Sequence, residues 1–297
     1  MADKINILVT GSDGQLGNSI KKVSNSFDNY NLYYTDKSQL DVSNYISLEK
    51  HVNDYEIDII INCAAFTNVE AAEINRDMSD KINHIALDNL SKICYENKIQ
   101  LIHISTDFVF DGLKSVPYTE IDNPNPINYY GLTKLNGEKK ILKYDLNKSI
   151  IIRTSWLYSE LQNNFVSKIL DKINFQEDIK VVDNEFGSPT NAKDLAITIL
   201  TIIPSLKNNK TEVYHFCNTG ICSRYDLANE INRIIKGKSL VQSTNISDSK
   251  VKRPKFSALD NGKIIKRFNL EIKDWRHSLK DHLIDVISSK LSSYEIY

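Results

Sequence analysis

Glycine is scarce in this chain, since only 10 of the 297 residues are glycine, against a usual frequency of roughly 7%. Three of the ten nevertheless fall within seven residues, at Gly11, Gly14 and Gly17. Glycine reaches backbone conformations that other residues avoid, so a glycine-poor chain is expected to keep its glycines where the backbone requires them. The cluster therefore indicates a loop of special geometry near the start of the chain.

Paired cysteines are also missing. The four cysteines, Cys63, Cys94, Cys217 and Cys222, are scattered, and none belongs to a C-x-x-C pair. This spacing argues against a disulfide framework and against a zinc ribbon, and it is typical of a protein from a reducing compartment. A chain of 297 residues buries enough apolar surface to fold without a disulfide or metal. We predict no metal site.

Neither sign of charge predominates, and long apolar runs are absent. Lys and Arg number 37 and Asp and Glu number 38, which gives a net charge of −1 and lacks the basic excess of a nucleic-acid-binding protein. No apolar run approaches the roughly 18 residues of a membrane span. The N-terminus has no basic segment leading into an apolar one, so no secretion signal is predicted. We expect a cytoplasmic protein that binds neither nucleic acid nor membranes.

The first half of the chain alternates short β-branched runs with longer amphipathic segments. The predicted strands are 5–10, 31–35, 58–63, 101–106 and 149–155, and the predicted helices include 82–95 and 131–142. Apolar strands separated by helices are typical of a parallel sheet covered on both faces. The pattern predicts a Rossmann-like, doubly wound α/β domain that binds NAD(P) over residues 1–155.

After residue 156 the alternation of predicted strands and helices becomes less regular, and no linker rich in Pro, Gly or Ser separates the two halves. Predicted helices are 163–173, 193–203 and 224–235, and predicted strands are 179–182 and 213–217. We expect residues 156–297 to form mainly a smaller C-terminal substrate-binding lobe, part of which returns to the main sheet.

The glycine cluster lies in residues 10–17 (TGSDGQLG), after a predicted strand and before a predicted helix. Such a loop brings backbone N–H groups and the helix N-terminus to a pyrophosphate. A plain tight turn is the alternative, but the strand-loop-helix context favours NADH or NADPH as cofactor. Asp36 ends the second strand, where a carboxylate accepts from a ribose 2′-hydroxyl and favours NAD. Lys37 beside it favours a 2′-phosphate instead, so both cofactors stay open.

A Y-x-x-x-K motif, Tyr130 to Lys134, opens a predicted helix, and this spacing places both side chains on one helical face. An ammonium near a phenol is expected to lower its pKa from about 10, so that the tyrosine gives a proton to a developing alkoxide. Tyr33 and Tyr144 also precede a lysine by four residues, but only Tyr130 follows a strand that ends in a hydroxyl residue. That residue, Thr106, is expected to bind the substrate carbonyl oxygen, with an ordinary strand residue as the alternative.

These motifs resemble the dTDP-4-dehydrorhamnose reductases, which are extended short-chain dehydrogenases/reductases, almost from end to end. The spacing G-x-x-G-x-x-G is that of the superfamily. The matching segments are 10–17 (TGSDGQLG), 62–73 (NCAAFTNVEAAE), 105–112 (STDFVFDG), 126–138 (PINYYGLTKLNGE), 153–158 (RTSWLY), 163–165 (NNF), 186–190 (FGSPT), 214–228 (YHFCNTGICSRYDLA) and 253–260 (RPKFSALD). The resemblance implies NAD(P)H-dependent reduction of the C4 ketone of dTDP-4-dehydro-β-L-rhamnose to dTDP-L-rhamnose.

The resemblance also implies a role for each matching residue. The catalytic residues are Thr106, Tyr130 and Lys134, of which Tyr130 and Lys134 also contact the cofactor. The pyrophosphate is held by Gly11, Gly14, Gln15, Leu16 and Gly17, the adenosine by Asp36, Asp41 and Val42, and the nicotinamide side by Ala64, Ala65 and Thr67. The sugar is contacted by Val69, Thr106, Asp107, Phe108 and Trp156.

Four further positions qualify the resemblance. Arg253 is expected to neutralise the substrate diphosphate, with a solvated basic patch as the alternative. Asn83 matches a structural asparagine that supports the site through backbone contacts, with an N-cap as the alternative. Phe108 stands where the family usually has tyrosine, so a hydroxyl contact is lost. Ser19 stands where some relatives carry a glutamate that binds magnesium at a dimer interface, so we predict no such metal, while homodimerisation by other surfaces stays open.

Three other functions share parts of this pattern. A 4,6-dehydratase or epimerase has the same fold and Tyr–Lys pair, but such dehydratases place Asp-Glu directly after the threonine, where this chain has Asp107 and Phe108. A reductase of another nucleotide-linked 4-keto-6-deoxy sugar, for example a UDP-linked one, requires only small changes in the pocket. A non-catalytic, NADP-binding regulatory subunit is disfavoured by the complete set of catalytic residues.

Overall fold

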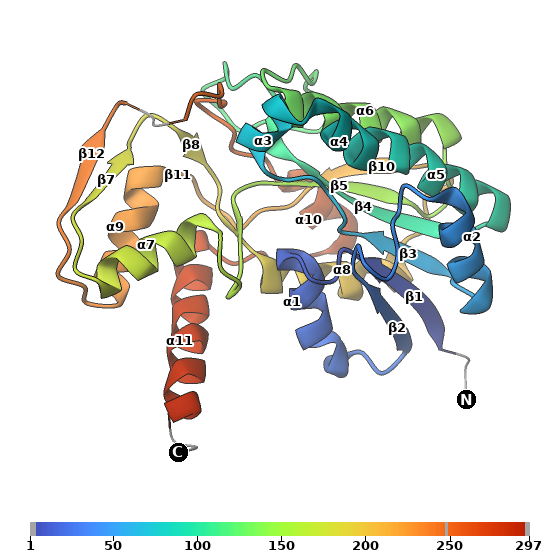
Figure 1. Cartoon of the computed structure of the whole chain (residues 1–297), viewed down its shortest axis with the longest axis horizontal. Helices are drawn as coiled ribbons and strands as arrows, with labels where there is room; N and C mark the ends of the chain where they lie inside the picture. The colour runs from blue at the N-terminus through green and yellow to red at the C-terminus, as the bar shows by residue number, and fades with distance from the viewer. Residues whose placement is uncertain (1–3, 247–248, 295–297) are drawn as a thin grey trace.

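The computed structural model describes residues 4–246 and 249–294. Residues 1–3 belong to the N-terminal segment in which no secretion signal is predicted, and they lie outside the described residues. Six parallel strands form the central sheet in the order β10-β5-β4-β3-β1-β2 (Figure 1). In chain order they are β1 (Ile5–Thr10), β2 (Tyr30–Thr35), β3 (Ile59–Asn62), β4 (Gln100–Thr106), β5 (Ile150–Thr154) and β10 (Glu212–His215). The predicted doubly wound α/β sheet is confirmed.

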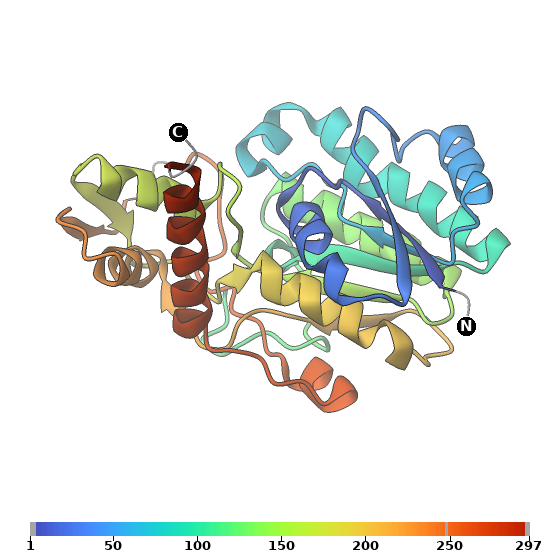
Figure 2. The same cartoon turned by 90° about the horizontal axis from the view of Figure 1, so that it is seen from below.

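Helices cover both faces of this sheet (Figure 2). On one face pack α1 (Gln15–Val23), α8 (Ala192–Ile202) and α10 (Gly262–Phe268), and on the other α2 (Tyr45–Asp54), α5 (Ala86–Asn97) and α6 (Tyr129–Tyr144). Side chains of a strand alternate between faces. Ile7 and Val9 of β1 accordingly lie in the core under α1 and α8, and Leu8 lies in the core under α5 and α6. All three are fully buried, as a two-faced parallel sheet requires.

A short series of helical segments connects β3 to α5. It consists of α3 (Val69–Ile74), α4 (Arg76–Asp80) and a π-helical turn (Lys81–Ile85) that leads directly into α5. The sequence predicted one regular helix over 82–95, whereas the structure replaces its first turn with the wider π turn. Short 3-10 turns at Ser24–Ser26, Asp107–Val109 and Ile203–Ser205 complete the large body.

A smaller lobe, on the left in Figure 1, has its own apolar cluster. It is built from α7 (Phe165–Asn174), α9 (Arg224–Ile234), α11 (Trp275–Tyr294) and the parallel pair β7 (Ile179–Val182) and β12 (Val241–Thr244). Two-residue pairs connect it to the large body: β6 (Leu157–Tyr158) with β9 (Thr190–Asn191), and β8 (Phe186–Gly187) with β11 (Cys222–Ser223).

The second half of the chain contributes to both bodies. Strand β10 pairs with β5 in the main sheet, and α8 packs against the same face as α1. The main sheet therefore takes elements from beyond residue 155, while the division of the chain into two domains at that point stays a prediction. Within residues 4–246 and 249–294, no helix is both long enough and apolar enough to cross a membrane.

Candidate active site

The glycine loop closes tightly between β1 and α1. Gly11 has φ +63°, and a Cβ built on it would lie 2.7 Å from the backbone nitrogen of Ala64. A Cβ on Gly17 would lie 2.4 Å from the carbonyl oxygen of Gly11. Gly14 caps α1 without a side chain to bond the first backbone N–H groups. The loop thus leaves a helix N-terminus with free donors, which fits a pyrophosphate.

A cavity of about 730 Å³ opens under this loop, at the carboxyl ends of the parallel strands, where ligands of open α/β sheets bind. Its wall contains all but one of the residues predicted to bind cofactor or substrate. From the cofactor set these are Gly11, Gly14, Gln15, Leu16, Gly17, Asp41, Val42, Ala64, Ala65, Thr67, Tyr130 and Lys134. From the substrate set they are Val69, Thr106, Asp107, Phe108, Trp156 and Arg253.

Asp36 is the one predicted residue outside the cavity wall. One of its carboxylate oxygens accepts from the backbone N–H of Ser38 at 2.8 Å, the Ser38 hydroxyl at 2.6 Å and the Gln39 N–H at 3.1 Å. These bonds lower the pKa of Asp36 and make it the support of a turn. Lys37, in contrast, lines the cavity, and a lysine there suits a 2′-phosphate.

The proposed catalytic residues come from two rigid elements. Thr106 ends β4, and Tyr130 and Lys134 lie on the first turns of α6. The helix begins here because the Asn128 side chain accepts from the backbone N–H of Gly131 at 2.9 Å, as an N-cap does. The Thr106 hydroxyl contacts the Tyr130 phenol. All three residues lie in the wall of this cavity, and their catalytic roles stay a prediction.

The pKa of Tyr130 corrects one expectation. Burial raises it to about 12, which outweighs the lowering by the Thr106 hydroxyl, so the predicted depression by Lys134 is wrong in this structure. The Nζ atom of Lys134 donates to the carbonyl oxygen of Ile104 at 2.7 Å. Burial also lowers the pKa of Lys134 to about 8. The phenol therefore carries its proton at neutral pH.

Asn83 supports the loop that carries the nicotinamide-side residues. It lies fully buried in the π turn. Its side chain accepts from the backbone N–H of Phe66 at 2.8 Å and donates to the carbonyl oxygen of the same residue at 3.0 Å. It also donates to the Thr133 hydroxyl on α6 at 3.1 Å. The predicted support through backbone contacts is confirmed, and the alternative of an N-cap is not.

On the substrate side, an arginine that the sequence did not single out lies over Trp156. The guanidinium carbon of Arg224 lies 3.6 Å from the centroid of the Trp156 ring and 4.9 Å from that of Phe165. Trp156 itself has φ +47°, a conformation that costs a bulky residue about 1–3 kcal/mol. Burial lowers the pKa of Arg224 to about 10, and it remains a cation at neutral pH. Strain and a stacked cation together indicate a binding surface.

A second cleft, of about 1200 Å³, extends from this point between the two bodies. It shares Trp156, Arg224 and Arg253 with the first cavity. Arg253 donates to the carboxylate of Glu70, so it is paired and is not part of a merely solvated basic patch. Together the two arginines place positive charge where the cavities join, which suits a diphosphate.

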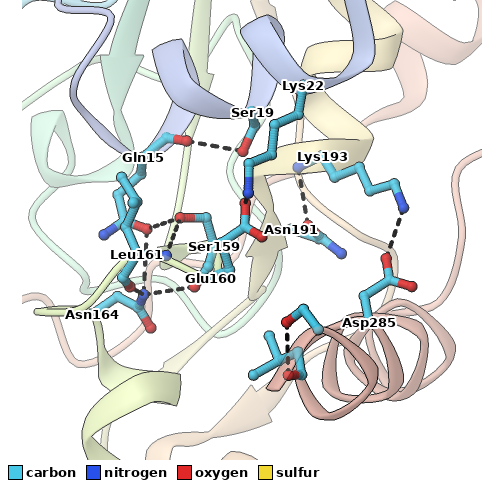
Figure 3. A network of polar contacts seen from close by, with 12 residues as sticks. Gln15, Ser19, Lys22, Ser159, Glu160, Leu161, Asn164, Asn191, Lys193 and Asp285 are labelled. Atoms are coloured by element: carbon cyan, nitrogen blue, oxygen red, sulfur yellow. Dashed lines mark hydrogen bonds and ion pairs between the residues drawn. The ribbon is translucent and has the colours of Figure 1, made fainter. Parts of the chain in front are cut away.

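A polar network ties the glycine loop to residues 159–164 (Figure 3). The Oε1 atom of Gln15 accepts from the Ser159 hydroxyl and from the amide of Asn164, and Glu160 pairs with Lys22 of α1. Ser19, at the position where some relatives bind magnesium, donates its hydroxyl to the carbonyl oxygen of Gln15 at 2.9 Å. No group of His, Cys, Asp and Glu suited to a metal occurs in the described residues.

Comparison with known proteins places this site in a family. The family model described as the RmlD substrate binding domain matches residues 5–287. A dTDP-4-dehydrorhamnose reductase of Aggregatibacter actinomycetemcomitans is 32% identical over 286 residues, covering 93% of this chain and 97% of that protein. The chain belongs to the dTDP-4-dehydrorhamnose reductase family.

Two other relatives are named as reductases of different keto sugars. The crystal structure of dTDP-4-dehydrorhamnose reductase from Bacillus anthracis, in complex with NADP, has a TM-score of 0.89 at 34% identity, covering 96% of this chain and 99% of that one. A dTDP-4-keto-6-deoxy-D-glucose reductase of Streptomyces niveus is 32% identical and covers 77% of this chain and 78% of that protein. The family thus includes enzymes named for two different keto sugars.

Proposed function

We propose that this protein reduces the C4 ketone of dTDP-4-dehydro-β-L-rhamnose to dTDP-L-rhamnose with NADPH. The observation that carries the proposal is the meeting of Thr106, Tyr130 and Lys134 in the cavity beneath the glycine loop. Lys37 in the wall and Asp36 bound in its own turn favour NADPH over NADH. The names of relatives at 32% and 34% identity agree with this activity.

The chemistry follows from what each side chain can do. When bound, NADPH supplies the hydride that reduces the ketone carbon. Tyr130 holds its proton at neutral pH, since its pKa is raised to about 12, and donates that proton to the oxygen as negative charge develops there. The Thr106 hydroxyl, in contact with this phenol, orients the same oxygen. In this proposal Lys134 binds the cofactor ribose and stabilises the phenolate that remains.

The remainder of the substrate has complementary groups in the two cavities. The sugar lies against Asp107, Phe108 and Trp156, and the diphosphate lies against Arg224 and Arg253, where the cavities join. To admit the diphosphate, Arg253 exchanges Glu70 for phosphate oxygens. Phe108 packs edge-on against Tyr130, with ring centroids 5.8 Å apart, so it shields the phenol from water instead of adding a hydroxyl contact.

The proposal is tested by NADPH oxidation against a panel of nucleotide-linked 4-keto sugars. The expected result is turnover with dTDP-4-dehydro-β-L-rhamnose and little or none with UDP-linked analogues. A preference for dTDP-4-keto-6-deoxy-D-glucose, as the Streptomyces niveus relative suggests, would change the substrate and leave the reaction class intact. Formation of a 4-keto product from dTDP-glucose and NAD would instead show a dehydratase.

The variant Tyr130→Phe tests the proposed acid, since it removes the phenolic hydroxyl alone. Turnover should fall by at least about 100-fold, the usual contribution of a general acid, while NADPH affinity changes little. Unchanged turnover would refute the assignment of the acid. Absence of turnover on every keto sugar, together with capture of a tight protein partner, would support a regulatory subunit.

We further propose that the protein acts in the cytoplasm, where NADPH and nucleotide sugars are made. All four cysteines are free thiols, and three of them are buried, which agrees with the reducing conditions of that compartment. A homodimer is compatible with this proposal, and light scattering of the purified protein distinguishes it from a monomer.

A further inference from the structure

A chain of buried polar side chains runs from the glycine loop to the catalytic lysine. The Thr10 hydroxyl donates to Oδ1 of Asn62 at 2.6 Å, and the Asn62 amide nitrogen lies 3.0 Å from Nδ1 of His103. The other ring nitrogen, Nε2, lies 3.2 Å from Nζ of Lys134. None of these four residues is more than 1% exposed.

The backbone register of the sheet builds this chain. Thr10 of β1 pairs with Asn62 of β3, and Asn62 pairs with His103 of β4. The three side chains therefore stand side by side on one face of three neighbouring strands. This is the face on which α6 packs, so the row ends at Lys134. The arrangement is fixed by rigid elements and not by loops.

Burying such a row of polar side chains costs free energy, which indicates that the row has a role. Polar groups placed in a dry core lose their hydration, and apolar residues of similar size would pack there at lower cost. The strand residues two positions earlier on the same face, Leu8, Ile60 and Leu101, are indeed apolar and fully buried. The change from apolar to polar residues occurs where the strands reach Lys134.

The bonding pattern of His103 follows from its partners. Burial and the positive charge of Lys134 hold its pKa well below the ordinary value, so the ring is neutral, with one donor and one acceptor nitrogen. An ammonium only donates, so Nε2 accepts from Lys134 and the ring proton is on Nδ1. A proton on Nδ1 requires an oxygen at Asn62. A half-turn of the amide, away from the orientation in which Thr10 donates to Oδ1, brings that oxygen to Nδ1 and the NH₂ group to the Thr10 hydroxyl oxygen.

We propose that His103 is a positioning residue that holds the Lys134 ammonium through Nε2, while Asn62 contacts its other ring nitrogen, Nδ1. The consequence for the rate rests on the proposed function, because it is measured on the reduction of a keto sugar. The effect on the lysine itself does not rest on it. Besides His103, the titratable groups that act on Lys134 are Glu138 of α6 and Cys63 after β3.

The test measures the titration of Lys134 by NMR on lysine-labelled protein without added nucleotide, with Lys134→Met identifying the signal. His103→Leu removes the acceptor, and the loss of a bond to a charged group should shift the lysine pKa down by about one to two units. His103→Gln, which retains an acceptor, should restore part of the shift. Asn62→Asp offers only acceptor oxygens and a negative charge, and should move the pKa upward.

Thr35→Val is the matched control. Thr35 is the register partner of Thr10 on β2, it is also buried, and its hydroxyl has no hydrogen-bond partner in the described part of the chain. Replacement should leave the Lys134 titration unchanged. Equal titrations in the parent, His103→Leu and Asn62→Asp proteins would overturn the proposal, as would equal shifts in Thr35→Val.

A second readout links the chain to the reaction. In His103→Leu, kcat for the keto sugar should fall about 3- to 25-fold at pH 7.5, with the alkaline limb moved to lower pH and the KM for NADPH little changed. A uniform loss at all pH values, with a falling melting temperature, would indicate a merely structural role. If the parent reduces no keto sugar but the lysine titration still responds, the proposed function fails and the positioning role stands.

Discussion

The most buried ion pair of the described residues offers a quantitative test of how the site is held. Glu138 of α6 and Arg153 of β5 are paired through two bonds, Nε to Oε1 at 2.9 Å and the second nitrogen to Oε2 at 2.7 Å. Their side chains are 1% and 5% exposed. The same carboxylate accepts from the Ser105 hydroxyl of β4. One side chain therefore joins the helix that carries Lys134 to the strand that ends in Thr106.

Glu138→Leu should destabilise the protein strongly. It leaves the Arg153 guanidinium buried without its counter-charge, a change that typically costs about 3–5 kcal/mol. That is a large share of a total stability of about 5–15 kcal/mol. The double variant Glu138→Leu/Arg153→Met should recover most of the loss, because replacing both ions of a buried pair with apolar groups is often neutral.

The assay is urea unfolding followed by circular dichroism, with Asp285→Ala as the control. Asp285 pairs with Lys193, but both side chains are more than half exposed, and such a pair contributes at most about 1 kcal/mol. A loss below about 1 kcal/mol in Glu138→Leu would refute the reasoning. So would a double variant that is no more stable than the single one, since the cost would then not come from the unpaired arginine.

Three further results are expected at the cofactor site. Lys37→Ala should weaken NADPH binding about tenfold by loss of a charge-assisted contact and leave NADH binding unchanged, as measured by fluorescence titration. Gly11→Ala places a Cβ 2.7 Å from the Ala64 nitrogen at φ +63°, so NADPH binding should be largely lost, and normal binding would contradict the tight approach. In the parent protein, kcat/KM should fall as pH rises through the Lys134 pKa, about 8, because the ammonium is present only below it; a flat profile from pH 6 to 9 would exclude this role.

The sheet and the reacting residues could be predicted because their signals are local. Apolar strands, the glycine loop and the Tyr130–Lys134 spacing each occupy a short stretch of sequence, and the rule that ligands bind at the carboxyl ends of parallel strands brings them together. Helix α11 was missed although its signal is also local. Trp275, Leu279 and Leu283 recur every four residues and are fully buried, which is the spacing of one helix face.

Asp36 carries two local signals at once. Its position at the end of β2 predicts a ribose contact, and the serine two residues later, Ser38, predicts a turn. Aspartate with a hydroxyl and N–H groups two and three residues on commonly forms a turn of its own. The structure realises that turn through Ser38 and Gln39. The carboxylate is therefore engaged in this turn, while its contact with the ribose stays a prediction.

His103 and Arg224 could not be found from spacing alone. The role of His103 depends on its pairing with Asn62, 41 residues away, and on a helix that follows later in the chain. Arg224 acquires its role by stacking on Trp156, which belongs to another segment. Both contacts depend on the register and packing of the completed fold, and a lone His in an apolar strand is most simply interpreted as part of the core.

The site divides into a rigid and a tethered part, and this division follows from where the side chains originate. Thr106, Tyr130 and Lys134 project from β4 and α6, whose backbones are held by the sheet and by the buried Glu138 pair. Arg253, in contrast, comes from a loop and is held by Glu70. Geometry that must be accurate for proton transfer lies on rigid elements, and contacts that must open for a substrate lie on loops. Changes in the first part should therefore alter kcat, and changes in the second should alter KM.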